Sequence, residues 1–467
     1  MIRVSSVRCV ACGGCVPICP ENALEVSNSI LTVNSNCTGC GLCFPVCPHG
    51  ALGFEEEYEL HEIRPADDEF DIVVIGGGPG GSTAAFFAAS AGAKVLLLEK
   101  KSVVGIPQLC AEGVSTTGLC DVYPEIEPEW ISTTIEGAIL VSPEGNRIRV
   151  RHPKAGYILE RRIFDRSLFA NAAKAGASTI TTAPAKSLLW KNDYIVGVGY
   201  EHLGTRRMAK CKVIIAADGV ESNVARWVFP KDRLSSREIH VAAQVVMSGV
   251  DCEEGFPEFH IGRKIAQGGY AWVFPKGTGI ANVGLGINPS LKETDGKTAW
   301  ELLRTFINSR FGDSGRIIEI ASGNVPTAKR LHRIAYRNVL FVGDAGRLTD
   351  PISGGGIATA LLSGKIAGKL AAEAVMNKKP EHIESALDDY NHIWDKAKGK
   401  QMSLYVKGKE VFSKLPDAEL EGICDFIDER FGHDSFDAID IPGTIAAILR
   451  RKGLIWNIFK SLLPTGE

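Results

Sequence analysis

Residues 70–81 read FDIVVIGGGPGG, a mostly apolar run followed by five glycines that one proline interrupts. A segment of small residues, 82–91, comes next, and a second apolar run, 94–98, ends at Glu99. Short apolar runs bounded by glycines are typical of buried strands, and the small-residue segment is typical of a helix packed closely on a sheet. The order of strand, glycine turn, helix, strand and acid predicts a Rossmann-type dinucleotide site.

The glycines and the acid have separate tasks in this pattern. We expect Gly76 to make the tight turn, Gly78 to let the backbone approach a diphosphate, and Gly81 to let helix and strand pack closely. Glu99 is placed to accept a hydrogen bond from the 2′-hydroxyl of a ribose. The alternative is a purely structural glycine-rich turn, but all the features fall in the order that dinucleotide binding requires.

Two later segments favour FAD over NAD. Residues 213–219 read VIIAADG, a strand ending in Asp-Gly, while 338–346 read NVLFVGDAG, a strand ending in Gly-Asp, and SGGGI at 353–357 then begins an expected long helix. An acid at a strand end suits a ribityl hydroxyl, and a helix N-terminus suits the pyrimidine edge of a flavin, where reduced flavin carries negative charge. Each segment alone could be an ordinary strand–turn–helix corner. The predicted FAD contacts are Asp218, Gly219, Gly343, Asp344, Gly355, Gly356 and Ile357.

Eight of the thirteen cysteines form two copies of one spacing, 28 positions apart, near the N-terminus. Each copy follows C-x2-C-x2-C-x3-C-P, the run that ligates bacterial-type [4Fe–4S] clusters, in which the fourth cysteine serves the other cluster. We therefore assign one cluster to Cys9, Cys12, Cys15 and Cys47 and the other to Cys37, Cys40, Cys43 and Cys19.

Other interpretations of these cysteines are weaker. Two zinc sites of four thiolates each are an alternative, but zinc ribbons use two cysteine pairs separated by a longer loop. A disulfide framework fits poorly, because the chain is large, shows no signal peptide and scatters its other cysteines singly. The runs therefore predict transfer of single electrons in a reducing compartment. Of the remaining cysteines, those interpreted as packing residues are Cys120, Cys211, Cys252 and Cys424.

Length and charge limit the class of protein further. A chain of 467 residues is expected to hold roughly three domains. The formal net charge of −3 gives no basic footprint for nucleic acid. No uncharged apolar stretch reaches about 18 residues, so we expect no transmembrane helix and a cytoplasmic location, with peripheral contact to the inner membrane surface as an option.

Residues 70–440, about four-fifths of the chain, resemble the geranylgeranyl reductase family within the superfamily of FAD-dependent hydroxylase-like proteins. The Asp-Gly and Gly-Asp segments are marks of the superfamily. The narrower mark is YAWVFPKG at 270–277, continuing to NVGLG at 282–286, which is similar to the family's YxWxFPKG…NVGxG run. The loop IPQLCAEG at 106–113 also resembles a family loop beside the flavin. So does the pair Arg162…Asp165, from which Arg162 is taken as a cofactor contact.

The motifs and the resemblance together imply an α/β architecture with α+β parts. The polar segment 62–69 is expected to be a domain boundary. The expected parts are a ferredoxin domain at 1–62, a Rossmann-type FAD domain at 70–235 and 330–380 that includes parts of the interdomain sheet, a substrate-binding antiparallel sheet domain at 236–329, and a helical C-terminal region at 381–467.

The substrate side is predicted from an aromatic stripe. Tyr270, Trp272 and Phe274 alternate with period two, so one face of a strand should carry all three. Such a stripe is more often packed core than cavity, but the resemblance implies that it closes a long apolar tunnel over the flavin, with Pro275 at its end. The resemblance also places Cys110 near the isoalloxazine with a catalytic role, although a lone cysteine is usually a small buried hydrophobe.

Two basic features have alternative interpretations. Lys276 and the pair Arg263-Lys264 could meet a phosphate head group, although loop cations are usually only solvated. Near the C-terminus, apolar residues recur at helical spacing between 444 and 462 beside several cations. This pattern suits a helix lying on a membrane surface, or equally a helix packed on the body of the protein.

These features predict an FAD-dependent oxidoreductase that acts on CH–CH bonds and saturates C=C bonds of polyprenyl groups, in archaeal-type lipid precursors. Its two [4Fe–4S] clusters would pass on electrons from an upstream low-potential donor, such as another ferredoxin. One alternative is an electron-transfer flavoprotein that passes electrons between FAD, the clusters and a quinone. A second alternative is a non-catalytic electron carrier, which would not need a complete substrate-side sheet.

Overall fold

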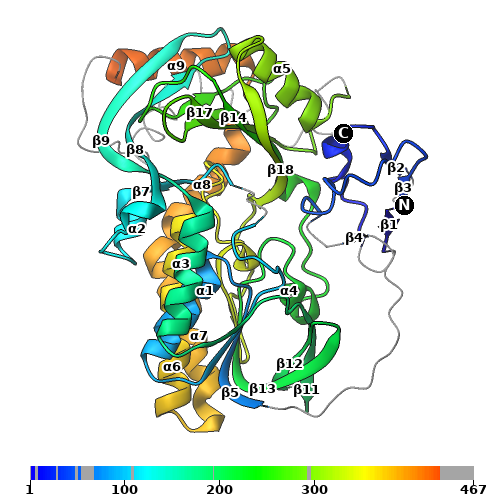
Figure 1. Cartoon of the computed structure of the whole chain (residues 1–467), viewed down its shortest axis with the longest axis vertical. Helices are drawn as coiled ribbons and strands as arrows, with labels where there is room; N and C mark the ends of the chain where they lie inside the picture. Colours follow the sequence, from blue (N-terminus) through cyan, green and yellow to red (C-terminus); the bar gives the residue numbers. More distant parts are fainter. Residues whose placement is uncertain are drawn as a thin grey trace, which may run out of the picture.

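The computed structural model describes eight stretches of the chain, namely residues 2–5, 9–27, 30–47, 51–53, 68–106, 110–192, 194–291 and 296–431. Three bodies are visible in Figure 1: a small N-terminal body, an α/β body at one end and a second sheet with its helices at the other. The predicted polar boundary at 62–69 and the predicted C-terminal helix at 444–462 fall largely or wholly outside the described residues.

The α/β body is built on the glycine-rich motif. Its sheet has the order β10-β6-β5-β13-β12-β11, and β20 also pairs with β13, with β19 beside it. β5 pairs in parallel with β6 and β13, and β13 with β20, so the predicted parallel Rossmann sheet is present. The strands are β5 (Asp68–Ile75), β6 (Val95–Leu98), β10 (Ser178–Ile180), β11 (Ala185–Lys191), β12 (Tyr194–His202), β13 (Thr205–Ala216), β19 (Ala335–Tyr336) and β20 (Val339–Phe341).

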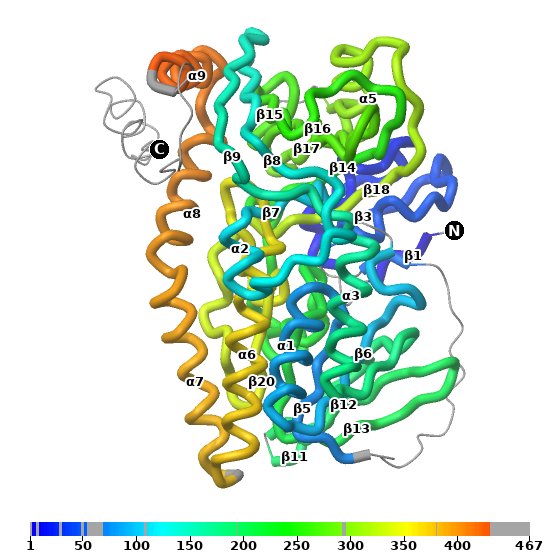
Figure 2. The backbone as a smooth tube through the Cα atoms, turned by 60° about the vertical axis from the view of Figure 1, so that its left-hand side comes forward, coloured from blue at the N-terminus to red at the C-terminus, as the bar shows by residue number. Residues whose placement is uncertain are grey.

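Helices cover this sheet because small residues let them approach it. α1 packs against α6, and at Gly364 and Gly368 an added Cβ would overlap backbone carbonyl oxygens of α1. The π-helix Asp395–Gly399 joins α7 to α8, which together form one long column along the side of the molecule in Figure 2. The helices of this body and column are α1 (Pro79–Ser90), α3 (Arg161–Lys174), α4 (Asn223–Val228), α6 (Ile357–Asn377), α7 (Ile383–Trp394) and α8 (Lys400–Phe412), while α9 (Asp417–Phe431) packs on β9 of the second sheet.

The second sheet has the order β18-β14-β17-β16-β15-β8-β9-β7. The segment predicted for substrate binding, 236–329, supplies β14 to β18, while 113–159 supplies β7 to β9, so the sheet is assembled from two separated pieces of chain. One of its faces is covered by α5 (Ala299–Phe311). The strands are β7 (Gly113–Ser115), β8 (Ile131–Val141), β9 (Arg147–Leu159), β14 (Ile239–Ser248), β15 (Glu258–His260), β16 (Tyr270–Pro275), β17 (Ile280–Ile287) and β18 (Arg316–Pro326).

The N-terminal body packs on the second sheet rather than on the Rossmann sheet. Its apolar residues share one core with β14, β16, β17 and α5. The Ser322 hydroxyl of β18 donates a 2.7 Å hydrogen bond to the carbonyl of Leu42, and an added Cβ at Gly14 would lie 2.8 Å from the side chain of Ile239. Its elements are β1 (Arg3–Val4), β2 (Leu24–Ser27), β3 (Ile30–Val33), β4 (Leu52–Gly53) and the short 3-10 helix Val16–Ile18.

Short helices complete the connections. Their bounds are α2 (Thr116–Cys120) and the 3-10 turns Pro128–Trp130, Ser236–Glu238, Gly343–Gly346 and Pro380–His382. In the described part of the chain, no helix is both long and apolar enough to cross a membrane. The predicted α/β fold, with an antiparallel sheet and a helical C-terminal region, is confirmed.

Candidate functional site: a cluster body, a flavin cradle and an aromatic face

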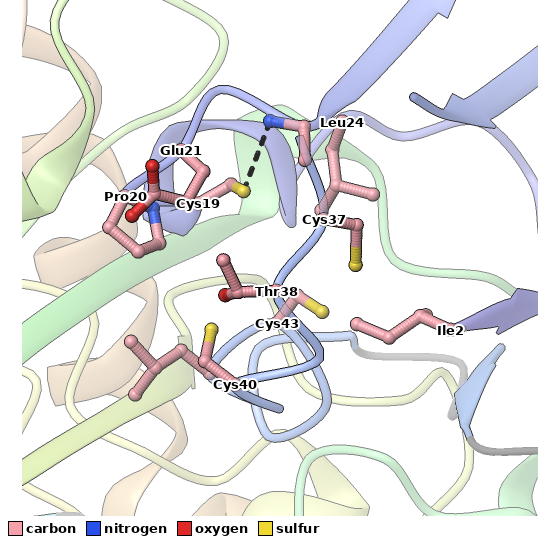
Figure 3. A pocket seen from close by; sticks show the side chains of 11 residues that line it. Ile2, Cys19, Pro20, Glu21, Leu24, Cys37, Thr38, Cys40 and Cys43 are labelled. Carbon is pink, nitrogen blue, oxygen red and sulfur yellow. Dashed lines mark hydrogen bonds between the residues drawn. The ribbon is translucent and has the colours of Figure 1, made fainter. Parts of the chain in front are cut away.

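The N-terminal body contains a cavity where one predicted cluster would lie. The lining of this cavity includes Cys19, Cys37, Cys40 and Cys43. Figure 3 shows the four thiols around one space, with Cys19 contributed by the first run and the other three by the second. Folding therefore brings together the four cysteines that the crossed ligand pattern requires.

Electrostatic contacts between the thiols show the same crossing in both sets of cysteines. Burial raises the pKa of the Cys15 thiol, and the next contribution comes from neighbouring Cys47 of the second run. Burial likewise raises the pKa of Cys43 to about 12, with further contributions from nearby thiols that include Cys19 of the first run. Thiols crowded in this way are stabilised as ligands once a cluster neutralises their charge.

The two runs also repeat each other's hydrogen bonds. The Ala23 N–H donates to Cys19 Sγ at 3.2 Å, and the Ala51 N–H donates to Cys47 Sγ at 3.1 Å, with 28 positions between corresponding residues. Hydrogen bonds to cysteine sulfur are one way in which proteins set cluster potential. Within the described residues, no three ligating side chains lie close enough together to hold a single metal ion. The thiols that ligate a four-iron cluster lie farther apart than the ligands of one ion.

The glycine-rich turn forms a cradle that fits a dinucleotide. Gly76 has φ +106°, and an added Cβ there would overlap the carbonyl of Ala217; one at Gly81 would overlap the carbonyl of Gly76. At Gly78 and Gly219, by contrast, an added Cβ would meet nothing within 4 Å. The turn is thus tight on the protein side and open on the other, which is where a diphosphate can approach the N-terminus of α1.

Glu99 lies at the end of β6 beside this turn. Its buried carboxylate accepts hydrogen bonds from the backbone N–H groups of Gly77 at 2.6 Å and Lys101 at 2.8 Å. These bonds fix the direction of the carboxylate at the edge of the cradle. Its predicted contact with a ribose hydroxyl stays a prediction.

The Asp-Gly segment, Asp218-Gly219, adjoins the cradle and also hydrogen-bonds the N-terminus of α4. The Asp218 carboxylate accepts from Ser222 Oγ at 2.6 Å and from the Val224 N–H at 3.1 Å, which caps the start of α4. Burial raises the pKa of Asp218, and these two hydrogen bonds oppose the rise. Both carboxylate oxygens are therefore engaged within the chain, and it is Gly219, with φ +79°, that faces open space.

The Gly-Asp segment meets the N-terminus of α6. Asp344 Oδ1 accepts a 2.6 Å hydrogen bond from the Thr349 hydroxyl, and an added Cβ at Gly356 would lie 3.2 Å from the same oxygen. Burial raises the pKa of Asp344, opposed by Thr349 and by the charge of Arg161. The Gly343 N–H donates to Ser363 Oγ at 3.1 Å, so this strand end is tied to the helix. Gly355 and Ile357 complete the turn into α6.

Asp165 pairs with Arg161 in the structure, and the cofactor contact expected of Arg162 stays a prediction. Arg161 makes the bidentate contact, with Nε and Nη2 at 2.7 and 2.9 Å from the Asp165 carboxylate, and both side chains are buried. Arg162 instead pairs with Glu319 of β18 at 2.7 Å, and its side chain is 45% exposed. Residues three and four apart are both neighbours on a helix surface, so spacing alone allows either arginine to reach Asp165. The buried Arg161 makes the contact, while Arg162 pairs with Glu319.

The aromatic stripe lies on one face of β16, as predicted. Trp272 and Phe274 pack with Ile158, and the partly buried Tyr270 and Phe259 adjoin them. The Tyr270 hydroxyl donates to the carbonyl of Ser353, which ties this face to the loop before α6. Pro275 ends the strand and is buried. The opposite face of β16 carries Ala271 and Val273, which belong to the core shared with the cluster body.

The loop that contains Cys110 lies against the same face. The carbonyl of Cys110 accepts hydrogen bonds from Asn282 Nδ2 at 3.0 Å and from Gln244 Nε2 at 3.2 Å. Asn282 Oδ1 in turn accepts from the indole N–H of Trp272 at 2.9 Å. Burial raises the pKa of Cys110, with Arg161 opposing the rise. The loop and the aromatic stripe are therefore fixed to each other through two strands of the second sheet.

Lys276 is not the solvated loop cation that the sequence suggested. Its Nζ lies 2.6 Å from Glu112 Oε2 and 3.2 Å from Glu160 Oε2, with only 10% of the side chain exposed. The backbone N–H of Arg263, in the loop after β15, donates to the side chain of Asp417, the first residue of α9, at 2.7 Å. Of the other predicted packing cysteines, Cys211 and Cys424 are buried, while Cys120 and Cys252 are half-buried.

Four polar residues of the site were not predicted from the sequence, although two of them carried a usable signal. Gln244 and Asn282 are single polar residues inside otherwise apolar strands, both buried, and that isolation is a usable signal. Arg161 and Glu112 carried no such signal, because charged residues next to helix starts and turns are common. The missed residues are Glu112, Arg161, Gln244 and Asn282.

The cradle, the strand-end acids and the eight cysteines define an FAD-dependent oxidoreductase that carries two [4Fe–4S] clusters. Family models agree along the chain: a 4Fe-4S dicluster domain matches residues 8–51, an FAD dependent oxidoreductase 71–220 and the geranylgeranyl reductase catalytic domain 238–325. The chain belongs to the geranylgeranyl reductase family.

Individual relatives support this membership. The digeranylgeranylglycerophospholipid reductase of Methanosarcina acetivorans is 35% identical over 366 residues, which are 77% of this chain and 88% of the relative. That of Methanocella arvoryzae is 40% identical over 324 residues, 68% of this chain and 81% of the relative. A crystal structure of a geranylgeranyl bacteriochlorophyll reductase-like protein from Thermoplasma acidophilum is 31% identical, with a TM-score of 0.77 over 85% of this chain and all of that one. The flavin-dependent brominase Bmp2, 18% identical with a TM-score of 0.62, shares the fold alone.

Proposed function

We propose that this protein saturates C=C bonds of geranylgeranyl chains in lipid precursors of the digeranylgeranylglycerophospholipid class, with electrons that pass through its own clusters. One observation carries the substrate side: the aromatic face of Tyr270, Trp272 and Phe274 lies against the Cys110 loop, and the Tyr270 hydroxyl ties it to the loop before α6. A mostly apolar surface with a few fixed polar groups is what a long hydrocarbon chain requires.

The electron side of the proposal is supported by where the cluster body lies. The cluster body packs on β14 and β18. Gln244 of β14 donates to the carbonyl of Cys110, and Val325 of β18 lies beside Gly354 in the turn before α6. Electrons would then cross one layer of sheet between the clusters and the flavin site. The upstream partner would be a low-potential donor such as another ferredoxin, because clusters of this type can work at about −400 mV or lower.

When bound, FAD would collect two electrons and supply a hydride, and the chain would orient the alkene and exclude water. The residues proposed to hold it are those of the cradle and the strand ends, with Gly76, Gly78 and Gly81 at the diphosphate and Asp344 at the ribityl chain. An isolated prenyl alkene also needs a proton, so a proton donor is a required part of the site.

Contact with a membrane surface is a further part of the proposal. A prenyl lipid is stored in or delivered from a membrane, and the basic amphipathic pattern at 444–462 suits an interfacial helix. Because that segment lies outside the described residues, its support is the sequence pattern and the chemistry of the substrate.

The function can be tested by supplying electrons directly. Dithionite-reduced protein should saturate a geranylgeranyl lipid, which mass spectrometry would detect as a gain of two mass units per bond, while NADPH alone should do little. If the reduced protein passes electrons to a quinone and leaves every prenyl double bond intact, the quinone-linked alternative is correct.

Replacing Trp272 with alanine should weaken use of the lipid and leave flavin reduction unchanged. The ring is 6% exposed and lies over Gly284, where any Cβ would overlap it, so its loss removes the floor of the proposed tunnel. We expect KM for the lipid to rise by about tenfold or more, since about 1.4 kcal/mol of lost contact is tenfold in affinity. Steady-state kinetics with dithionite would measure this.

Two controls accompany this variant. Trp190→Ala, at a tryptophan that is 47% exposed on β11, should leave KM unchanged. Trp272→Phe should retain most of the affinity because it keeps a ring on the stripe. An unchanged KM in Trp272→Ala would remove this face from the substrate site.

A further inference from the structure

Three charged side chains form a continuous line from the surface to the substrate side. Glu160, at the N-terminus of α3, is 32% exposed and contacts Lys276 Nζ at 3.2 Å. Lys276 is 10% exposed and contacts Glu112 Oε2 at 2.6 Å. Glu112 is 2% exposed, so each step along the line is more buried than the one before. No step of flavin or cluster binding described above uses these three groups.

We propose that Glu160, Lys276 and Glu112 are a proton path, and that Glu112 at its inner end supplies the proton that saturation of the alkene needs. The inference rests on the proposed function, since a proton is needed there only if a C=C bond is reduced.

The inner end of the path lies at the predicted reaction site. Glu112 is two residues from Cys110, and its Oε2 is 3.5 Å from Asn282 Nδ2, which also donates to the carbonyl of Cys110. The next residue, Gly113, approaches the ring of Phe274 so closely that an added Cβ would lie 3.0 Å from it. The carboxyl of Glu112 thus lies at Asn282, which also hydrogen-bonds the carbonyl of Cys110 and the indole of Trp272.

The backbone of Glu112 is itself unusual. Its φ is +72°, a left-handed conformation that residues with a side chain rarely adopt. The surrounding hydrogen bonds hold it there: its carbonyl accepts from the Leu159 N–H at 2.9 Å and its N–H donates to Cys110 Sγ at 3.2 Å. Backbone strain of this kind gathers at functional sites, where the fold imposes it to aim a side chain.

Burial lets Glu112 carry a proton at a higher pH than an ordinary carboxyl. Burial raises its pKa; Lys276 and Arg161 oppose the rise and Glu160 adds to it, with Cys110 as the other titratable neighbour. A buried carboxyl with a raised pKa is the usual form of a general acid that works near neutral pH. An adjacent lysine that reaches the surface through Glu160 gives it a route to recover the proton.

The proposed reduction of one C=C bond is balanced in protons and electrons. Saturation of one C=C bond takes a hydride, which the FAD-dependent activity supplies, and one proton. The O–H bond of Glu112 breaks, a C–H bond forms on the alkene, and Glu112 is left as a carboxylate. Lys276 then returns a proton to Glu112 and is itself reprotonated from solvent through Glu160.

The decisive variant is Glu112→Gln, which keeps the shape and loses the transferable proton. Reduction of the flavin by dithionite should proceed as in the unaltered protein, while reoxidation by the geranylgeranyl lipid should slow by about 100-fold or more, the usual contribution of a general acid. In the unaltered protein lipid reduction should fall as pH rises through the pKa of Glu112, because only the protonated form donates. Glu319→Gln, at an exposed ion pair of β18, is the matched control and should change neither.

Two further measurements extend this comparison, and the first of them needs no turnover with lipid. Infrared titration of the protein without lipid should show a carboxyl that deprotonates above the ordinary range, present in Glu319→Gln and missing in Glu112→Gln. Lys276→Arg keeps the ion pair but cannot release a proton, so it should allow a first turnover and slow the following ones.

The outcomes separate this inference from the function on which it rests. If the unaltered protein does not reduce the lipid, the proposed function fails. If it does, and Glu112→Gln and Lys276→Arg reduce the lipid at the same rate with the same pH profile, the proton path is wrong. Should Glu112→Gln fail to fold, the Lys276→Arg kinetics and the infrared titration of the unaltered protein still decide.

Discussion

Replacing Cys19 with serine should remove the cluster held mainly by the second cysteine run, although Cys19 belongs to the first. The cavity lined by Cys37, Cys40 and Cys43 also takes Cys19 as its fourth thiol, and a cluster with three thiolates left is easily lost. Anaerobically purified protein should fall from about eight irons to about four per chain. Electron delivery from a protein donor should then be nearly abolished, since one step of the path is missing.

Iron analysis and electron paramagnetic resonance would measure this effect. Cys252→Ser is the matched control, because Cys252 is a half-buried cysteine beside the same shared core and should leave both clusters intact. If Cys19→Ser and Cys9→Ser remove the same cluster signal, the ligands are not crossed. Stoichiometric zinc in place of iron would overturn the cluster assignment altogether.

Replacing Asp344 with alanine should cause purified protein to lose most of its FAD. Asp344 lies at the end of β20, with Gly356 at the N-terminus of α6 directly against one carboxylate oxygen. A hydrogen bond to a charged group is worth about 1.5–3 kcal/mol, and removal of the carboxylate also leaves the Thr349 hydroxyl without its partner. Affinity for FAD should therefore fall by roughly 10- to 100-fold.

The flavin-to-protein ratio and a calorimetric titration of the apoprotein with FAD would measure this change. Asp313→Ala, at an exposed aspartate near the start of β18, should keep full flavin occupancy. Glu99→Ala should lower the affinity for FAD less than Asp344→Ala does, because it removes only one predicted hydrogen bond to the ribose. Normal FAD content in Asp344→Ala would mean that the acid serves only to hold Thr349 and the turn.

The features that were predictable from the sequence are those in which neighbouring residues act together. The glycine turn around Gly76 and Gly81, the cysteine runs, and the stripe of Trp272 and Phe274 each follow from spacing along one short segment. Close backbone approach requires glycine, cluster ligation requires fixed cysteine intervals, and a strand alternates its faces with period two. The fold class, the cofactors and the family follow from these local patterns.

The features that only the tertiary structure decided depend on contacts between distant segments. Lys276 looked like a solvated loop cation, yet folding buries it against Glu112, 164 positions away. Spacing within α3 allows either Arg161 or Arg162 to pair with Asp165, and packing decides that the buried Arg161 does so. The second sheet takes β7 to β9 from 113–159, and the cluster body docks on that sheet's far face. Burial and pairing across such separations are set by packing, which no local pattern encodes, and that is why the proton path became visible only in the folded chain.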